Sequence, residues 1–114
     1  MKKLILFGTG KYGMEALNFF GRENILYFTD NNKGLQGREI DGIRIISPKE
    51  LNKHIKDADV VLAAGDTVCL QMEYQLKKQG VEAFLNYRFA RKFIDKEKRS
   101  IDTFLKDIST DGMV

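Results

Sequence analysis

The chain has 114 residues, of which 43% are hydrophobic and 31% are charged, and this is the length and composition of one globular domain with a sizeable core. Its formal net charge is +3. Residues 88–99 hold six basic and two acidic side chains, so the rest of the chain is close to neutral and we expect no nucleic-acid-binding face there.

The single cysteine, Cys69, excludes an intramolecular disulfide and indicates a reducing compartment. The apolar run at residues 4–7 is too short for a signal peptide or a membrane span. We therefore expect a cytoplasmic protein with no membrane span.

The N-terminal part of the chain predicts a strand, a helix and a second strand. Residues 4–7, "LILF", form an apolar run bounded by glycine, which is typical of a strand buried on both faces of a parallel sheet. Small and apolar residues then recur at helical spacing from Gly13 to Phe20, and Gly21 is placed to end that helix. Residues 25–30, "ILYFTD", have the composition of a second strand.

The middle of the chain predicts a small hairpin followed by a helix. The pair Asp41 and Gly42 predicts a tight turn between two short strands at 39–40 and 43–46. Ser47, Pro48 and Glu50 then have the spacing of a capping box with proline at the first helical position, and Leu51 and Ile55 would supply the buried face of the helix.

Residues 58–87 predict a strand, a helix and a last strand. The strand lies in "ADVVLAAGD" at 58–66, the helix covers about 67–79, and "EAFLNY" at 82–87 is the last strand. Strands that alternate with helices favour a parallel sheet with helices on both faces. We therefore predict an α/β fold over residues 1–87, a Rossmann-like three-layer domain with a mostly parallel sheet of about five strands and a small β-hairpin insertion.

Residues 88–114 differ in character from the predicted domain and form a helical tail. Phe89 and Phe93 are four residues apart, and a second apolar stripe comprises Ile101, Phe104, Leu105 and Ile108. We interpret this tail as a linker to a missing domain, or as the surface of a homodimer or of a contact with a partner domain.

Three glycines, Gly8, Gly10 and Gly13, have G-x-G-x-x-G spacing between the first strand and its helix. In such a motif the first glycine allows a tight turn, the second lets a phosphate approach the backbone, and the third lets the helix pack closely. The free N–H groups of the first helical turn bind an anion there. The alternative is that the glycines only make a tight turn and bind nothing.

Asp30 ends the second strand, 22 residues after Gly8, as the nucleotide-binding motif requires. Its carboxylate could accept hydrogen bonds from a ribose diol, or it could cap the turn that follows. Asn31 could read a base edge or a sugar hydroxyl, and it is equally suited to forming a turn.

Gly65 and Asp66 follow the strand at 59–63 and should face the same crevice, because ligands bind outside the carboxyl ends of strands in open α/β sheets. Asp66 is more typical of a helix N-cap than of a ligand-binding group. Lys11 lies in the positive first turn of a helix, where a cation is unfavourable unless an anion binds beside it. Tyr12 could close over a ligand or pack in the core.

No histidine and cysteine cluster has the spacing of metal ligands, and no serine or cysteine has the setting of a nucleophile. We therefore expect no metal site and no catalytic residue. The chain by itself is expected to bind a ligand rather than to catalyse a reaction.

The stretches "ILFGTGKYGMEAL", "YFTDNN", "GREIDGIRIISPKEL" and "DADVVLAAGD" together resemble the Rossmann-like N-terminal domain of bacterial enzymes that modify sugars and surface polysaccharides. This domain precedes FkbM-type methyltransferases and some capsule glycosyltransferases, and a related one begins the sugar O-acyltransferases. The resemblance covers residues 1–87. It implies a nucleotide-sugar ligand held by Gly8, Thr9, Gly10, Lys11, Asp30 and Asn31.

This resemblance favours a nucleotide- or nucleotide-sugar-binding domain of a larger methyl- or glycosyltransferase as the function. One alternative is the NAD-binding domain of an oxidoreductase that lacks its substrate domain. Another is a structural module that binds no ligand and docks partner domains through its tail. The cofactor is thus unknown, with a nucleotide or nucleotide-sugar favoured over NAD.

Overall fold

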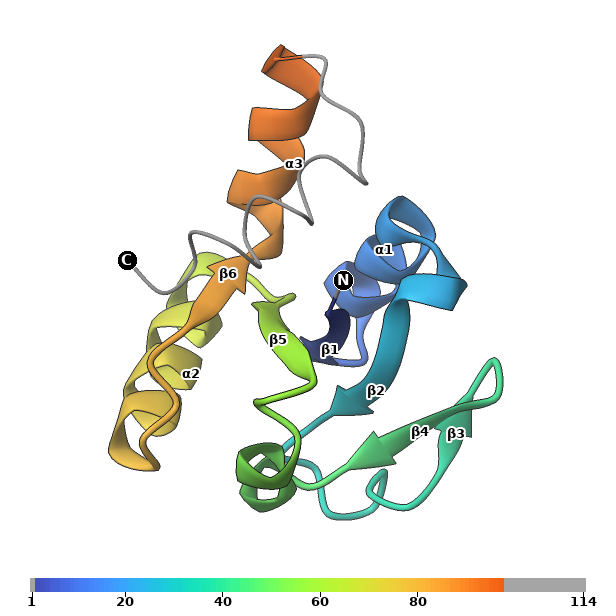
Figure 1. The fold of residues 1–114 in the computed structure, drawn as a ribbon, viewed down its shortest axis with the longest axis vertical. Coiled ribbons are helices and arrows are strands. Elements are labelled where there is room, and N and C mark those ends of the chain that lie inside the picture. Colours follow the sequence, from blue (N-terminus) through green and yellow to red (C-terminus); the bar gives the residue numbers. More distant parts are fainter. Residues whose placement is uncertain (1, 98–114) are drawn as a thin grey trace.

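The computed structural model describes residues 2–97, which form one six-stranded sheet with helices on both of its faces (Figure 1). The strands are β1 (Lys3–Phe7), β2 (Ile25–Thr29), β3 (Glu39–Ile40), β4 (Ile43–Ile46), β5 (Ala58–Leu62) and β6 (Phe84–Asn86). The α-helices are α1 (Lys11–Phe20), α2 (Asp66–Lys78) and α3 (Tyr87–Glu97), and two short 3-10 helices are η1 (Arg22–Asn24) and η2 (Pro48–Lys53).

The strand order in the sheet is β3-β4-β2-β1-β5-β6. Every neighbouring pair is parallel except β3 and β4. The predicted α/β Rossmann-like fold is therefore confirmed. The sheet has six strands instead of about five, because β4 of the hairpin also pairs with β2, with Phe28 opposite Ile45 and Thr29 opposite Ile46.

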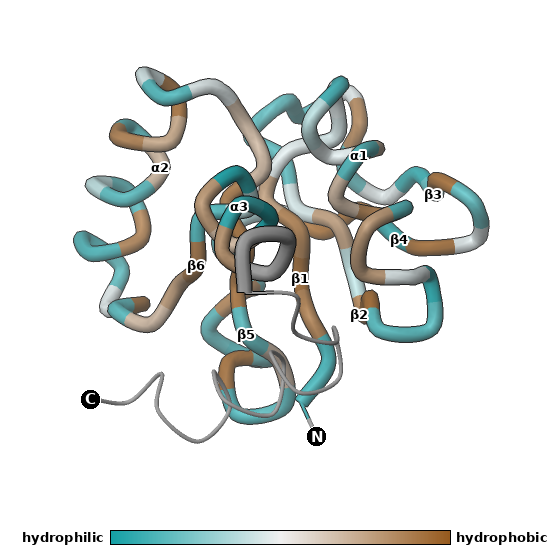
Figure 2. The backbone as a smooth tube through the Cα atoms, turned by 90° about the horizontal axis from the view of Figure 1, so that it is seen from above, coloured by the Kyte–Doolittle hydropathy of each residue, from teal (hydrophilic) through white to brown (hydrophobic). Residues whose placement is uncertain are grey.

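The core lies on both faces of the sheet, and β1 shows how the sequence divides it. Leu4 and Leu6 point into a cluster with α1 and α3, whereas Ile5 and Phe7 point into a second cluster with α2 and η2. All four side chains are at most 1% exposed. Figure 2 shows the hydrophobic central strands between α2 and α1. The continuous apolar run thus forms a doubly buried parallel strand, as predicted.

The hairpin turn is confirmed, since Asp41 and Gly42 both have positive φ angles, of 51° and 78°. The helix predicted after Ser47 is instead the 3-10 helix η2. The backbone N–H of Glu50 donates to the Ser47 carbonyl and that of His54 donates to the Leu51 carbonyl, so i→i−3 bonds tighten both ends. The Ser47–Glu50 capping box is present.

The last strand is shorter than predicted, because β6 covers only Phe84–Asn86. The side chain of Asn86 accepts a hydrogen bond from the Phe89 backbone N–H at 3.2 Å, which caps the first turn of α3. Tyr87 therefore begins a helix, and its ring is 1% exposed. Ala90 is also buried in the core.

The predicted tail is described only as far as α3. Phe89 is 65% exposed, whereas Phe93 packs against the core cluster around α1. The apolar stripe from Ile101 to Ile108 lies outside the described residues. Within residues 2–97, no helix is both long and apolar enough to cross a membrane.

One acidic side chain, that of Asp59, is half-buried in the sheet without full compensation of its charge. Asp59 lies on β5, where its Oδ1 atom is 3.9 Å from the Lys2 ammonium nitrogen, and its buried Oδ2 atom has no hydrogen-bond partner among the described residues. Burial raises the pKa of the Asp59 carboxyl, and the nearby Lys2 charge opposes this shift only in part.

We expect Asp59→Asn to stabilise the protein at pH 7 by about 1 kcal/mol, because it removes a poorly compensated charge from a half-buried position. The folded-state pKa of Asp59 lies above the unfolded value, so the folded state binds more protons between the two values and wild-type stability falls as pH rises through that window. Urea denaturation as a function of pH should show this decline in the wild type and not in the variant. A variant less stable than the wild type at pH 7 would show instead that Lys2 compensates the charge.

Candidate functional site

The glycine turn after β1 is held by two strand ends. Gly8 donates its backbone N–H to the Thr29 carbonyl at 2.9 Å, and Ala63 donates to the Phe7 carbonyl at 2.9 Å. Gly8 has a φ of 123°, and a Cβ atom there would overlap the Ala63 carbonyl oxygen. Position 8 therefore requires glycine, because the backbone that leaves β1 turns there in close contact with the ends of β2 and β5.

The other two glycines differ in what surrounds them. A Cβ atom at Gly13 would overlap the Gly8 carbonyl oxygen and lie 2.8 Å from its carbonyl carbon, so α1 can approach the turn only with glycine there. Gly10 is the N-cap of α1, has a φ of −84°, and would place a Cβ atom with nothing within 4 Å. The fold thus explains Gly8 and Gly13 by packing but gives no packing reason for Gly10.

Gly10 opens onto a cleft of about 360 Å³ at the carboxyl ends of β1 and β5. These two strands are neighbours, and their following helices, α1 and α2, cover opposite faces of the sheet. This is the topological switch point at which open α/β sheets bind their ligands. The walls are Phe7, Gly8, Thr9, Gly10, Lys11, Tyr12, Asp30, Asn31, Ala63, Ala64, Gly65, Val68 and Met72.

The cleft brings together all the predicted site residues except Gly13 and Asp66. Gly13 lies beneath the turn, against Gly8. Asp66 is the first residue of α2, whose N-cap is Gly65, so the expectation that Asp66 caps this helix is wrong. Its carboxylate instead accepts a hydrogen bond from Arg88 at 2.8 Å.

Sequence reasoning missed the apolar wall of the cleft. Val68 and Met72 lie one helical turn apart on α2, and Ala63 and Ala64 follow β5 directly. The spacing of Val68 and Met72 is also that of an ordinary core stripe, so the sequence carried no separate signal for them. The two alanines directly precede Gly65 and Asp66, the pair expected to face the crevice, but they were not themselves predicted to line it.

Asp30 connects the glycine turn to the loop after β2, and it lies just beyond the strand, which ends at Thr29 and not at Asp30 as predicted. Its Oδ2 atom accepts a hydrogen bond from the Thr9 hydroxyl at 2.8 Å, and its Oδ1 atom accepts one from the Asn32 backbone N–H at 2.8 Å. The turn-capping alternative for Asp30 is therefore observed. A carboxylate oxygen accepts more than one hydrogen bond, so both atoms retain capacity for a ligand hydroxyl.

Asn31 connects the same loop to α2. Its side-chain amide exchanges two hydrogen bonds with that of Gln75, at 2.9 Å and 2.8 Å. The two residues are 44 positions apart in the sequence, and the pair is exposed. Asn31 therefore borders the cleft with its amide already paired, which the sequence did not predict.

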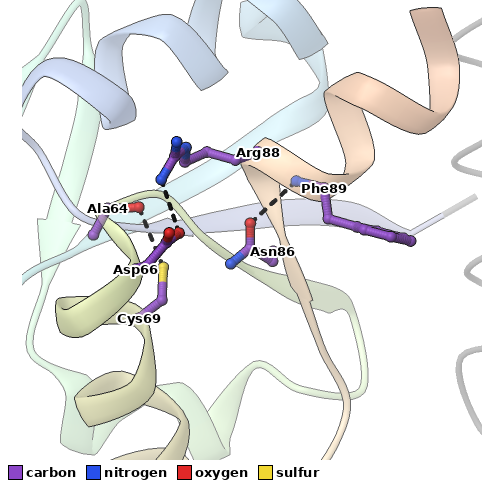
Figure 3. A network of polar contacts seen from close by, with 6 residues as sticks. All are labelled: Ala64, Asp66, Cys69, Asn86, Arg88 and Phe89. Atoms are coloured by element: carbon purple, nitrogen blue, oxygen red, sulfur yellow. Dashed lines mark hydrogen bonds and ion pairs between the residues drawn. The ribbon is translucent and has the colours of Figure 1, made fainter. Parts of the chain in front are cut away.

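Positive charge gathers at the glycine turn. The Lys11 ammonium lies 5.9 Å and the Arg88 guanidinium 5.2 Å from the centre of the Tyr12 ring. The first turn of α1 contains no acidic residue, so its free N–H groups and helix dipole add to this field. Arg88 reaches from α3 to the Tyr12 ring and also to the Asp66 carboxylate, a contact that Figure 3 shows.

The described part of the chain contains no cluster of histidine, cysteine and acidic side chains able to hold a metal ion. Cys69 lies below the cleft, where its thiol donates to the Ala64 carbonyl at 3.3 Å (Figure 3). Burial raises the pKa of this thiol, which keeps it protonated and unsuited to act as a nucleophile. The arrangement offers backbone N–H groups and cations to an anion and the Asp30 carboxylate to hydroxyl groups.

Comparison with known families matches residues 1–84 to the C2185-like N-terminal domain. The chain belongs to this family. No curated protein matches it. Among solved structures, this family member resembles the UDP-D-quinovosamine 4-dehydrogenase from Vibrio fischeri, with 25% identity and a TM-score of 0.59 over 75% of this chain and 76% of that chain.

A second group of similar structures consists of RSP, a Rex-family repressor. Its structure shares 20% identity with a TM-score of 0.59, over 75% of this chain and 44% of the repressor. RSP has also been described in complex with β-NADH, with a TM-score of 0.58, and with β-NAD⁺ and operator DNA. At this identity the likeness concerns the fold alone.

Proposed function

We propose that the cleft binds a nucleotide or nucleotide-sugar, with a phosphate on the backbone of the glycine turn. Gly10 carries this proposal, because packing explains Gly8 and Gly13 whether or not a ligand is present. At an N-cap, serine, threonine, aspartate or asparagine would stabilise the helix at least as well. A glycine without a packing reason, placed where a phosphate would approach the backbone, supports binding over an empty turn.

The remaining groups of the cleft fit the other parts of such a ligand. Lys11 offers charge to the phosphate, Asp30 offers acceptors to a ribose, and Val68 and Met72 provide an apolar wall for a base or sugar. The likeness to a protein named as a dehydrogenase of a UDP-sugar supports a nucleotide-sugar ligand.

We further propose that this domain works as part of a larger sugar- or polysaccharide-modifying transferase. Support comes from the resemblance of "GREIDGIRIISPKEL" and its neighbouring stretches to the domain that precedes such methyl- and glycosyltransferases. The name of the family, which describes an N-terminal domain, agrees with this proposal.

A second candidate function is NAD binding, which Asp30 favours. Asp30 directly follows β2 beside the glycine turn, where an acidic residue in dinucleotide-binding domains accepts hydrogen bonds from the ribose and opposes a 2′-phosphate. This candidate therefore predicts that NAD binds more tightly than NADP.

A thermal-shift panel on the 114-residue chain tests both candidates. The panel contains UDP, UDP-sugars, CDP, NAD, NADP, coenzyme A and S-adenosylmethionine. A ligand at one hundred times its Kd adds about 2.7 kcal/mol of stability, which raises the Tm on the order of 10 °C for a domain of this size. A shift with UDP or CDP compounds supports the first candidate, and a shift with NAD alone supports the second. The absence of a shift with every nucleotide would contradict both.

A further inference from the structure

Arg88 stands at the edge of the cleft without being part of its wall. It lies in the first turn of α3, and its guanidinium contacts two residues from other elements: the Tyr12 ring, 5.2 Å away, and the Asp66 carboxylate, 2.8 Å away. Tyr12 lines the cleft, and Asp66 follows Gly65, which also lines it. Arg88 therefore contacts the glycine turn through Tyr12 and the loop after β5 through Asp66.

The ion pair that holds Arg88 in this place is weak. The Asp66 side chain is 85% exposed and that of Arg88 is 38% exposed, so water screens their attraction. Exposed pairs of this kind contribute little to the stability of a protein. If Arg88 left Asp66 for another anion, water would solvate the carboxylate at little cost.

The Arg88 guanidinium also has N–H groups that make no hydrogen bond among the described residues. A guanidinium has five N–H groups in a fork that matches phosphate, and only the bond from Nη1 to Asp66 occupies it among the described residues. Lys11, on the glycine turn, lies 5.9 Å from the same Tyr12 ring. Two cations thus stand beside the Tyr12 ring, and Tyr12 itself lines the cleft.

We propose that Arg88 is a ligand-binding residue that selects diphosphates. One phosphate lies on the N–H groups of the glycine turn, and the guanidinium leaves Asp66 to bind the next phosphate, beside Lys11. This inference rests on the proposed function, because it assumes that the turn holds a phosphate. It narrows the ligand class to nucleoside diphosphates and their esters, such as nucleotide-sugars or dinucleotides.

Isothermal titration of the 114-residue chain with UDP, UMP, ADP and AMP tests this inference. Arg88→Gln should weaken binding of the diphosphates by about tenfold, the effect of one charge-assisted hydrogen bond, and should leave the affinity for the monophosphates nearly unchanged. Lys92→Gln removes the same charge from an exposed position of the same helix and should change neither. Asp66→Asn should strengthen diphosphate binding, because it releases Arg88.

The outcomes separate this inference from the proposed function. If Arg88→Gln weakens mono- and diphosphates equally, or weakens neither, Arg88 does not select diphosphates, while nucleotide binding by the cleft stands. If the wild type binds none of the four nucleotides and no nucleotide of the thermal-shift panel, both proposals fall. Circular dichroism of each variant would show that a loss of affinity does not arise from unfolding.

Discussion

Gly10→Val should reduce the affinity for the nucleotide at least tenfold while the domain remains folded. A Cβ atom at this position would meet nothing within 4 Å in the protein. The added side chain therefore occupies only space at the cleft, where a phosphate would approach the backbone. Titration of the bound ligand measures the loss, and the Tm without ligand should stay within a few degrees of the wild-type value.

Gly34→Ala is the matched control for this position. Gly34 is exposed in the loop between β2 and β3, and a Cβ atom there would meet only the Asn32 side-chain oxygen, at 3.3 Å. We expect it to change neither affinity nor Tm. Unchanged nucleotide affinity in Gly10→Val would mean that the phosphate does not lie on this turn, and the proposed binding mode would be wrong.

Gly13→Ala should destabilise the fold by about 3 kcal/mol or more, at the upper end of the cost of overpacking a core. The new Cβ atom would overlap the Gly8 carbonyl oxygen and lie 2.8 Å from its carbonyl carbon, both in backbone that cannot rotate away. In a helix interior, glycine to alanine normally stabilises by about 1 kcal/mol. Overlap with the Gly8 backbone thus predicts a loss of stability and helix propensity predicts a gain, so thermal unfolding distinguishes the two.

Asn18→Ala provides the comparison within the same helix. Asn18 is an exposed residue of α1, so alanine should leave the Tm unchanged or raise it slightly. A Gly13→Ala variant as stable as Asn18→Ala would show that α1 can move away from the turn. Gly13 would then need a reason other than its contact with Gly8.

Together these two positions separate what the turn does for the fold from what it does for a ligand. Gly13 should affect stability, and it should affect binding only through the fold. Gly10 should affect binding alone. If the glycines formed a tight turn that binds nothing, Gly10→Val would have no measurable consequence.

The alternation of strands and helices and the glycine turn could be predicted because their signals are local. The apolar run of β1, the helical spacing up to Phe20 and the Asp41–Gly42 turn each depend on a few consecutive residues. The exceptions lie at element ends. The helix expected after Ser47 is a 3-10 helix, and β6 ends at Asn86 because that side chain caps α3.

The sequence by itself determined which residues carry the glycine turn and that Asp30 lies beside it at the carboxyl end of the next strand, because parallel strands bring their carboxyl ends to one edge of the sheet. Only the tertiary structure decided that Arg88 stands beside Tyr12 and pairs with Asp66, and that Asn31 pairs with Gln75. Arg88 and Asp66 are 22 positions apart in the sequence, and Asn31 and Gln75 are 44 positions apart. These contacts form only because α2 and α3 pack on the sheet as they do. The periodicity of a segment predicts which face of a helix is buried, but it does not predict where a single side chain points.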